Sequence, residues 1–404
     1  MNASSRPVAD LLLHLCAAPE KELPESLIDH IRADDWDTII HLSTDLRLVP
    51  LLMRAIEGAA WAETLPPHAI DQLTAIRRDF AFMALRQAKG IASLAGRLQN
   101  QGLAPIFLKG TGVAFGCYPS PNLRPLRDAD ILLSKEGALA AQDILLAQPA
   151  YGYLDKGHEG ASRHHLRPLI DIETGLVIEL HHRISSTDDW GGEDALVQLL
   201  AEKPQRLEIL GQEIAVPCLS ANALHLVAHA GRRACFDNGP LVLSDLHFLL
   251  RSGDVQMDEM LDRADDLGLT PSLAMIACLA RSHGADWVAG PLEELADTAT
   301  SFLPAAEQAM LVDRSMLQSK KHRDRMAEAE RRDGLLAPLK KAFSPDPTAM
   351  ALQVGLDPAS MWRWLGYPVW LARRIAETIQ ARSAAGTRQE RIANDELKRW
   401  MADG

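Results

Sequence analysis

Two short apolar segments of this chain carry the acidic residues that are best suited to chemistry. Asp128 and Asp130 open the run DADILL (128–133). On a strand, residues two apart face the same side, so we expect the two carboxylates to project together. Adjacent carboxylates repel one another unless a cation lies between them, and Mg²⁺ prefers oxygen ligands. The pair therefore predicts a Mg²⁺ site, with Mn²⁺ as an alternative ion, shared with substrate phosphates.

A third carboxylate lies in LVIELHHRI (176–184), where apolar and polar positions alternate. The alternation places Glu179 and His181 on the polar face of a strand. Glutamate is disfavoured in strands and costly to bury, which favours a functional role. If the two strands are neighbours, Glu179 completes a three-carboxylate site that can hold one or two metal ions and position an attacking hydroxyl. The alternative is an exposed hairpin face on which Glu179 pairs with Arg183 or His181.

Residues suited to binding phosphates lie just before the aspartates in the sequence. A glycine turn follows the strand candidate PIFLKG (105–110), and backbone N–H groups at such a turn attract anions. An arginine can bind a phosphate with two parallel hydrogen bonds. We expect phosphate contacts from five residues: Lys109, Gly110, Thr111, Arg124 and Arg127. The alternatives are a solvent-exposed Lys109 and simple ion pairs between the two arginines and the nearby aspartates.

The elements that must position these residues form a small α/β unit between two helical regions. Apolar residues recur at three- and four-residue spacing up to about residue 100 and again from about residue 190 to the end. Between them lie the two strand candidates, an amphipathic helix at 135–148 and a β-hairpin of HHLRPLIDI and LVIELHHRI. We predict an α+β fold in which a small mixed β-sheet core (101–190) is embedded between an N-terminal helical region (1–100) and a C-terminal helical region (191–404).

Composition excludes several classes of protein. The 404 residues are 47% hydrophobic and 24% charged, as in an ordinary globular chain. The net charge of −12 argues against a broad electrostatic surface for nucleic acid or anionic lipid. Five cysteines without CxxC spacing predict free thiols in a reducing compartment. With no signal peptide and no run of roughly 20 apolar residues, we expect a cytoplasmic protein without a membrane span.

Other candidate residues favour structural interpretations. His225 and His229 have the spacing of a helical metal pair, but the HExxH glutamate is missing, so we expect packed histidines there and at His247. Asp245 interrupts an apolar helix, and it and His181 are candidates for the acceptor side of a site. We expect three tryptophans to lie in the core (Trp362, Trp364 and Trp370) and the charged stretch 320–334 to be a solvated helix or linker.

The order of these motifs resembles the uncharacterised nucleotidyltransferase family, which is placed in the polymerase-β-like nucleotidyltransferase superfamily. The resemblance covers about 105–184 closely and continues more loosely to about 300. It is carried by a strand, a glycine turn, a tyrosine, a proline loop, Arg-x₃-DxD and a later ELH, with these matching positions: Leu108, Lys109, Gly110, Tyr118, Arg124, Asp128, Asp130, Glu179, Leu180 and His181. Lys109-Gly110-Thr111 stands where the superfamily usually has Gly-Ser at the turn.

The resemblance implies a Mg²⁺-dependent enzyme that transfers a nucleoside monophosphate from an NTP, such as ATP, to an acceptor that is a small molecule, peptide or protein. Asp128, Asp130 and Glu179 would be the catalytic metal ligands, with Glu179 as second-metal ligand or general base. The alternatives are a phosphotransferase, a toxin that modifies tRNA or protein, and an inactive scaffold that binds a partner protein. Because adjacent carboxylates repel, we also expect Asp130→Asn to maintain or raise the stability of the metal-free protein.

Overall fold

The computed structural model describes most of the chain, which contacts divide into two compact units. The described residues are 6–154, 164–185, 190–253, 255–312, 350, 364, 366–372 and 388–403. The first unit comprises 1–154, 159–311 and 393–404, and the second comprises 155–158 and 312–392. The first unit therefore contains every element of the sheet and every candidate site residue.

In the second unit, Tyr367 stacks on Trp370, which is buried. Trp364 is 51% exposed, so the expectation that it lies in the core is wrong. Trp362 and the charged stretch 320–334 lie outside the described residues.

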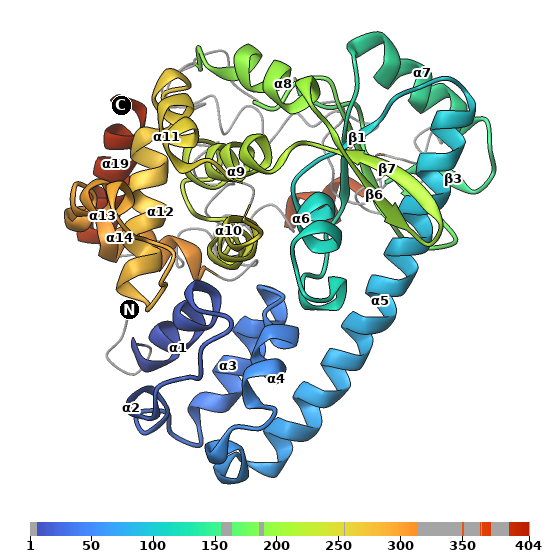
Figure 1. The fold of residues 1–404 in the computed structure, drawn as a ribbon. Coiled ribbons are helices and arrows are strands. Elements are labelled where there is room, and N and C mark those ends of the chain that lie inside the picture. Colours follow the sequence, from blue (N-terminus) through green and yellow to red (C-terminus); the bar gives the residue numbers. More distant parts are fainter. Residues whose placement is uncertain are drawn as a thin grey trace. The chain divides into compact units, whose positions relative to one another are not determined.

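Helices form the N-terminal part of the first unit. They are α1 (Arg6–Ala17), α2 (Glu25–Ile28), α3 (Asp35–Asp45), α4 (Val49–Ile56), the 3-10 helix η2 (Ala60–Thr64) and α5 (Pro67–Asn100). Helix α5 begins at a proline, whose fixed φ suits a first turn, and ends before Gly102, whose φ is 77°. Its first half packs on α3 and α4 through Ala69 and Leu73, and its second half covers the sheet through Ile91 and Leu94 (Figure 1).

The described strands form one mixed sheet of seven strands in the order β3-β4-β5-β2-β1-β7-β6. Strand β2 is parallel to β5 and antiparallel to β1, and β1 is parallel to β7. The strands are β1 (Ile106–Phe107), β2 (Ala129–Leu132), β3 (Tyr151–Tyr153), β4 (Leu169–Asp171), β5 (Val177–His181), β6 (Gln205–Ile209) and β7 (Gln212–Val216). The α+β class and the antiparallel β4–β5 hairpin are therefore confirmed.

Alternation along β2 and β5 separates the two faces of the sheet. Ala129, Ile131, Ile178 and Leu180 are at most 1% exposed and pack in one hydrophobic cluster with α5 and with α7 (Lys135–Leu146). Because successive side chains point to opposite faces, the acidic residues of both strands lie on the other face. The helix α6 (Gly110–Gly116) and the 3-10 helix η3 (Pro121–Leu123) connect β1 to β2.

The expectation of helices throughout the chain after residue 190 is wrong for 205–216. There β6 and β7 pair as an antiparallel hairpin and place β7 beside β1. The connecting residues Leu210 and Gly211 both have positive φ, at 51° and 80°, as a two-residue hairpin turn requires. The sheet thus takes two of its strands from beyond residue 190.

The buried α12 (Thr270–Ser282) packs against most of the other described helices that follow the sheet. Gly231 lies in a π-helix, η4 (Ala228–Arg233), so close to α12 that a Cβ would stand 2.5 Å from the Cβ of Ser272. The others are α8 (Glu193–Glu202), α9 (Leu219–Val227), α10 (Leu241–Arg251), α11 (Met257–Asp266), α13 (Pro291–Asp297), η5 (Thr300–Phe302), α14 (Leu303–Met310) and α19 (Arg388–Asp403). Among the described helices, none combines the length and the apolar character that crossing a membrane requires.

Glu193, at the start of α8, fixes the chain that follows β5. Its side chain is 3% exposed, and its Oε1 accepts hydrogen bonds from the N–H of Ile184 (3.0 Å) and of Ser185 (2.7 Å), while Oε2 pairs with Arg183. Burial disfavours the charged form, but Arg183 and the two amides outweigh burial and lower the pKa of Glu193.

We expect Glu193→Gln to lower the free energy of unfolding by about 2 kcal/mol near neutral pH, because a buried charge-assisted acceptor is lost. A carboxylate with a lowered pKa in the folded state stabilises above its unfolded pKa and loses this contribution as the pH falls through the folded pKa. The difference in melting temperature between wild type and variant should therefore shrink on acidification. The control is Asp194→Asn, since Asp194 also contacts Arg183 but its side chain is 84% exposed. An equal loss in both variants would contradict the role of Glu193.

Candidate active site

Asp130 and Glu179 lie directly opposite one another on the neighbouring parallel strands β2 and β5. The 48 residues between them in the sequence include α7, β3 and β4, so the sheet topology brings them together. Two residues further along β5, His181 lies on the same face. The structure therefore brings together Asp130, Glu179 and His181, of which His181 was expected on the acceptor side.

These three side chains form a compact, largely buried group. His181 Nε2 lies 2.8 Å from Asp130 Oδ1 and 3.2 Å from Glu179 Oε2. One ligand atom from each residue lies within 4.8 Å of the others, and the described residues contain no other such set of three. Their side chains are 6%, 17% and 1% exposed for Asp130, Glu179 and His181 respectively. Carboxylate oxygens and an imidazole nitrogen are donors that fit a divalent cation.

Lys109 is the fourth member of this centre. Its Nζ donates a hydrogen bond to Asp130 Oδ1 at 2.8 Å, and its side chain is only 12% exposed, so the alternative of a solvent-exposed lysine is wrong. The backbone of Lys109 has φ 48° and ψ −122°, a conformation that is strained for a residue with a Cβ. This strained turn ends β1 and directs the lysine to the neighbouring strand.

The other residues of the turn are enclosed by protein. A Cβ on Gly110 would stand 3.0 Å from Leu126 Cδ2 and 3.4 Å from Arg124 Nη2. Thr111 is 1% exposed, and its Oγ1 has no hydrogen-bond partner in the part of the chain that the structure describes. The phosphate contacts expected of these two residues remain predictions.

Asp128 lies immediately before β2, beside the group but outside it, and is half-buried. Burial, and then the charges of Asp130 and Glu179, raise the pKa of Asp128 to about 6. Asp130 behaves in the opposite way: burial opposes its charge, but Lys109 and His181 outweigh burial and hold the pKa of Asp130 well below its usual range. These directions argue against the expectation that Asp130→Asn maintains or raises the stability of the metal-free protein, because the repulsion disfavours the charges of Asp128 and Glu179, whereas Lys109 and His181 favour that of Asp130.

The pKa values of the two β5 residues shift for related reasons. Burial raises the pKa of Glu179, but its hydrogen bond with His181 outweighs burial and lowers it. Burial lowers the pKa of His181, but its contacts with Asp130 and Glu179 outweigh burial and raise it. The group thus favours the charged forms of all three side chains.

Two further histidines, which the sequence analysis did not single out, lie beside this group. The rings of His164 and His165 have centroids 5.4 Å and 5.2 Å from that of His181, and His165 pairs with His181 across an antiparallel bridge. His165 Nε2 lies 3.9 Å from Glu179 Oε2. The sequence contains one signal for these two histidines, the His-His pair at 164–165 before β4. This pair becomes informative only once the register of the hairpin is known.

The arginines expected at the phosphates lie in different environments. Arg124 makes two hydrogen bonds to Asp245 on α10, at 2.7 Å and 2.8 Å, rather than pairing with the nearby aspartates. Arg127 is exposed. Asp245 is 1% exposed, so it interrupts its apolar helix as the buried partner of Arg124.

The helical histidines are packed as expected. His225 and His247 are 2% and 1% exposed, and His247 Nε2 lies 3.2 Å from Glu20 Oε2. His229 Nδ1 lies 3.0 Å from Asn238 Nδ2. None of these histidines belongs to the set of potential metal ligands found among the described residues.

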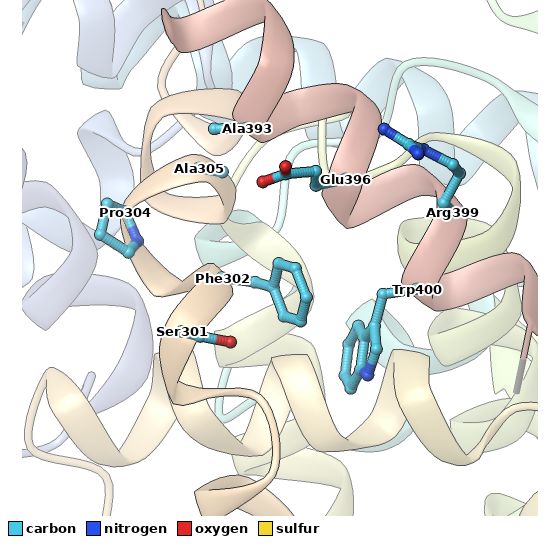
Figure 2. A pocket seen from close by; sticks show the side chains of 8 residues that line it. All are labelled: Ser301, Phe302, Pro304, Ala305, Ala393, Glu396, Arg399 and Trp400. Atoms are coloured by element: carbon cyan, nitrogen blue, oxygen red, sulfur yellow. The ribbon is translucent and has the colours of Figure 1, made fainter.

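A hollow of about 690 Å³ lies elsewhere in the first unit, between α19 and the segment formed by η5 and α14 (Figure 2). The rings of Phe302 and Trp400 stack there with centroids 4.9 Å apart. Its lining consists of Ser301, Phe302, Pro304, Ala305, Ala393, Glu396, Arg399 and Trp400. None of these residues belongs to the acidic centre, so the hollow is separate from the candidate site.

The fold and the site define an α+β protein in which two carboxylates and an imidazole lie close enough together to share one metal ion. The profile of the uncharacterised nucleotidyltransferase family matches residues 32–284, more than half of the chain, so the protein belongs to that family. The resemblance seen in the motifs is thereby confirmed, and the match begins well before residue 105, in the helices that precede the sheet. A search of curated proteins finds no match.

Proposed function

We propose that the protein is a divalent-metal-dependent nucleotidyltransferase that transfers a nucleoside monophosphate from an NTP to an acceptor. The observation that carries the proposal is the register that sets Asp130 opposite Glu179, with Lys109 on the same carboxylate. Membership of the family supports the same class of reaction. The acceptor is a small molecule, peptide or protein, since the net charge of −12 disfavours nucleic acid.

Asp130 and Glu179, with Asp128 beside them, would hold Mg²⁺ or Mn²⁺. A bound ion would neutralise phosphate charge and orient the reacting groups. In the proposed reaction an acceptor hydroxyl oxygen forms a bond to the α-phosphorus, the bond from that phosphorus to the bridging oxygen breaks, and pyrophosphate leaves. The acceptor proton goes to Glu179 or to water. The lowered pKa of Glu179 favours its role as a ligand over its role as a base.

Lys109 is the best-supported phosphate contact. Its ammonium is paired with Asp130, and a divalent cation at Asp130 would compete for that carboxylate and release the lysine toward the phosphates. Gly110, Thr111 and Arg127 remain candidates for the same role, whereas the guanidinium of Arg124 already makes two hydrogen bonds to Asp245. Of the two acceptor-side candidates, His181 lies within the centre itself and Asp245 is buried against Arg124.

One observation favours a second candidate function, an inactive scaffold that binds a partner protein. Lys109 and His181 both contact Asp130, so the carboxylate is neutralised by the protein's own groups without a metal. Such a site would be stable without ligands. Measuring metal and nucleotide binding separates the two functions, and the mass of the product separates nucleotidyl transfer from phosphoryl transfer.

We expect Mn²⁺ or Mg²⁺ together with a non-hydrolysable NTP to raise the melting temperature of the wild-type protein. At a ligand concentration of about 100 times Kd, the linked stabilisation is about 2.7 kcal/mol. Glu179→Gln should lose most of this effect because it removes a charged metal ligand. Glu173→Gln is the matched control, since Glu173 lies on the exposed hairpin turn and pairs with Lys89. If none of the four NTPs stabilises the wild type with either metal, the enzyme proposal fails and the scaffold is favoured.

A further inference from the structure

A buried polar cluster connects α10 to the loop that precedes β2. Asp245 Oδ1 and Oδ2 accept hydrogen bonds from Arg124 Nε and Nη2 at 2.7 Å and 2.8 Å. The Tyr118 hydroxyl lies 2.8 Å from Asp245 Oδ1 and 2.9 Å from Ser244 Oγ. A two-point contact between planar groups fixes orientation as well as distance. The Arg124 side chain is therefore held rigidly by a helix more than a hundred residues away in the chain.

Side chains from three parts of the unit hold the backbone just before the first aspartate of the DAD motif. The Pro125 carbonyl accepts hydrogen bonds from Arg124 Nη1 at 3.2 Å and from Arg47 Nη1 at 3.5 Å. The Leu126 carbonyl accepts one from Gln87 Nε2 on α5 at 2.9 Å. We call Arg47, Gln87, Arg124 and Asp245 the loop anchor. It reaches the loop from the α3–α4 connection, from α5 and from α10.

A restraint on this loop is needed because of the charges that surround Asp128. Asp130 and Glu179 repel its carboxylate more strongly than Lys109 and Arg47 attract it, so an unrestrained loop would relax away from the centre in the absence of a cation. A buried ion pair such as Arg124–Asp245 contributes little net stability compared with apolar residues of the same size. The geometry that the pair imposes is therefore a better explanation for its presence than stability alone.

We propose that the loop anchor is a set of positioning residues that holds the Asp128 carboxylate beside Asp130, so that both can bind one divalent cation. This role rests on the proposed function, and it assigns Arg124 to the protein's own loop and not to the phosphates of the substrate. The anchor acts on the metal only through Asp128, and this makes the role testable.

The test is Mn²⁺ binding, followed by the electron paramagnetic resonance signal of free Mn²⁺, well below the melting temperature of each variant. We expect Asp245→Asn to weaken Mn²⁺ binding about tenfold, the size of effect seen when a residue that orients a ligand is lost. In a protein that already carries Asp128→Asn, Asp245→Asn should cause no further loss, because the residue through which it acts is gone. Gln87→Met, nearly isosteric, should weaken binding in the same Asp128-dependent way if Asp245→Asn does not fold.

The control is Glu307→Gln in α14. Glu307 is a buried carboxylate that pairs with Arg6 and His283, so its loss should lower stability and leave Mn²⁺ binding unchanged. If the Asp245→Asn and Gln87→Met variants bind Mn²⁺ as tightly as the wild type, the positioning role is overturned and the proposed function stays intact. The same conclusion follows if the loss persists in the Asp128→Asn background. A wild type that binds no Mn²⁺ rejects the proposed function and the positioning role together.

Discussion

We expect Asp130→Asn to lower the rate of the proposed NTP turnover about a thousandfold and also to destabilise the metal-free protein. A metal ligand that supplies several kcal/mol of transition-state stabilisation corresponds to a loss of about a thousandfold in rate when it is removed. In the metal-free protein, the same carboxylate accepts hydrogen bonds from Lys109 and His181. Neutralising it removes the anionic partner of the buried Lys109 and leaves His181 with Glu179 alone, at an expected cost of about 3 kcal/mol.

Rate and stability should be measured separately for this variant. Turnover is followed by pyrophosphate release with each NTP, and stability by thermal unfolding in the presence of EDTA. Asp143→Asn, on the outward-facing part of α7, is a control for the loss of one negative charge. Unchanged stability of Asp130→Asn in EDTA would show that the ion pairs to Lys109 and His181 contribute nothing.

Asp128→Asn will do the reverse in the metal-free protein and raise its stability. The folded-state pKa of about 6 lies above the ordinary value of 3.8, so the charged form of Asp128 is disfavoured by folding. After a discount for its partial exposure, relieving this penalty is worth on the order of 2 kcal/mol near neutral pH. The gain should be complete above about pH 6 and absent below about pH 4, where the wild-type carboxyl is protonated in both states.

The measurement is the difference in melting temperature between Asp128→Asn and wild type in EDTA across that pH range. Added Mn²⁺ should stabilise the wild type more than the variant, because the cation removes the repulsion only where both carboxylates are present. If Asp128→Asn and Asp130→Asn lower stability equally, the division of charge between the two aspartates is wrong.

Local patterns in the sequence predicted the two strands of the site well. Alternation of apolar and acidic or histidine residues at 128–131 and 178–181 identified which residues face the core and which face the site, and both assignments agree with the structure. The sequence did not show that β2 and β5 are neighbours. Two parallel strands are joined by a long crossover, which leaves no local signal of their pairing. The β6–β7 hairpin was not predicted, although Gly211 lies in its turn, because the segments on both sides of it have helical periodicity.

The contacts that complete the site join residues far apart in the chain. Arg124 and Asp245 were each singled out, yet nothing local indicated that they pair with one another. No motif in the sequence marks Arg47 or Gln87, and only the packing of α5 against the loop gives Gln87 a role. His165 reaches Glu179 through the pairing of the strands rather than through its position in the sequence. Such roles depend on tertiary structure and could not be predicted from residue type and spacing.

Helix α5 also limits how the length of this chain can vary. Its 34 residues place Ala69 and Leu73 in one hydrophobic cluster and Ile91 and Leu94 in another. One inserted residue between these pairs would rotate the second half of the helix by about 100° and move it by about 1.5 Å relative to the first. Both pairs could not then remain buried. Insertions and deletions among family members should therefore avoid 73–91 and fall in surface turns, such as the one at Gly58, where a Cβ would meet nothing within 4 Å.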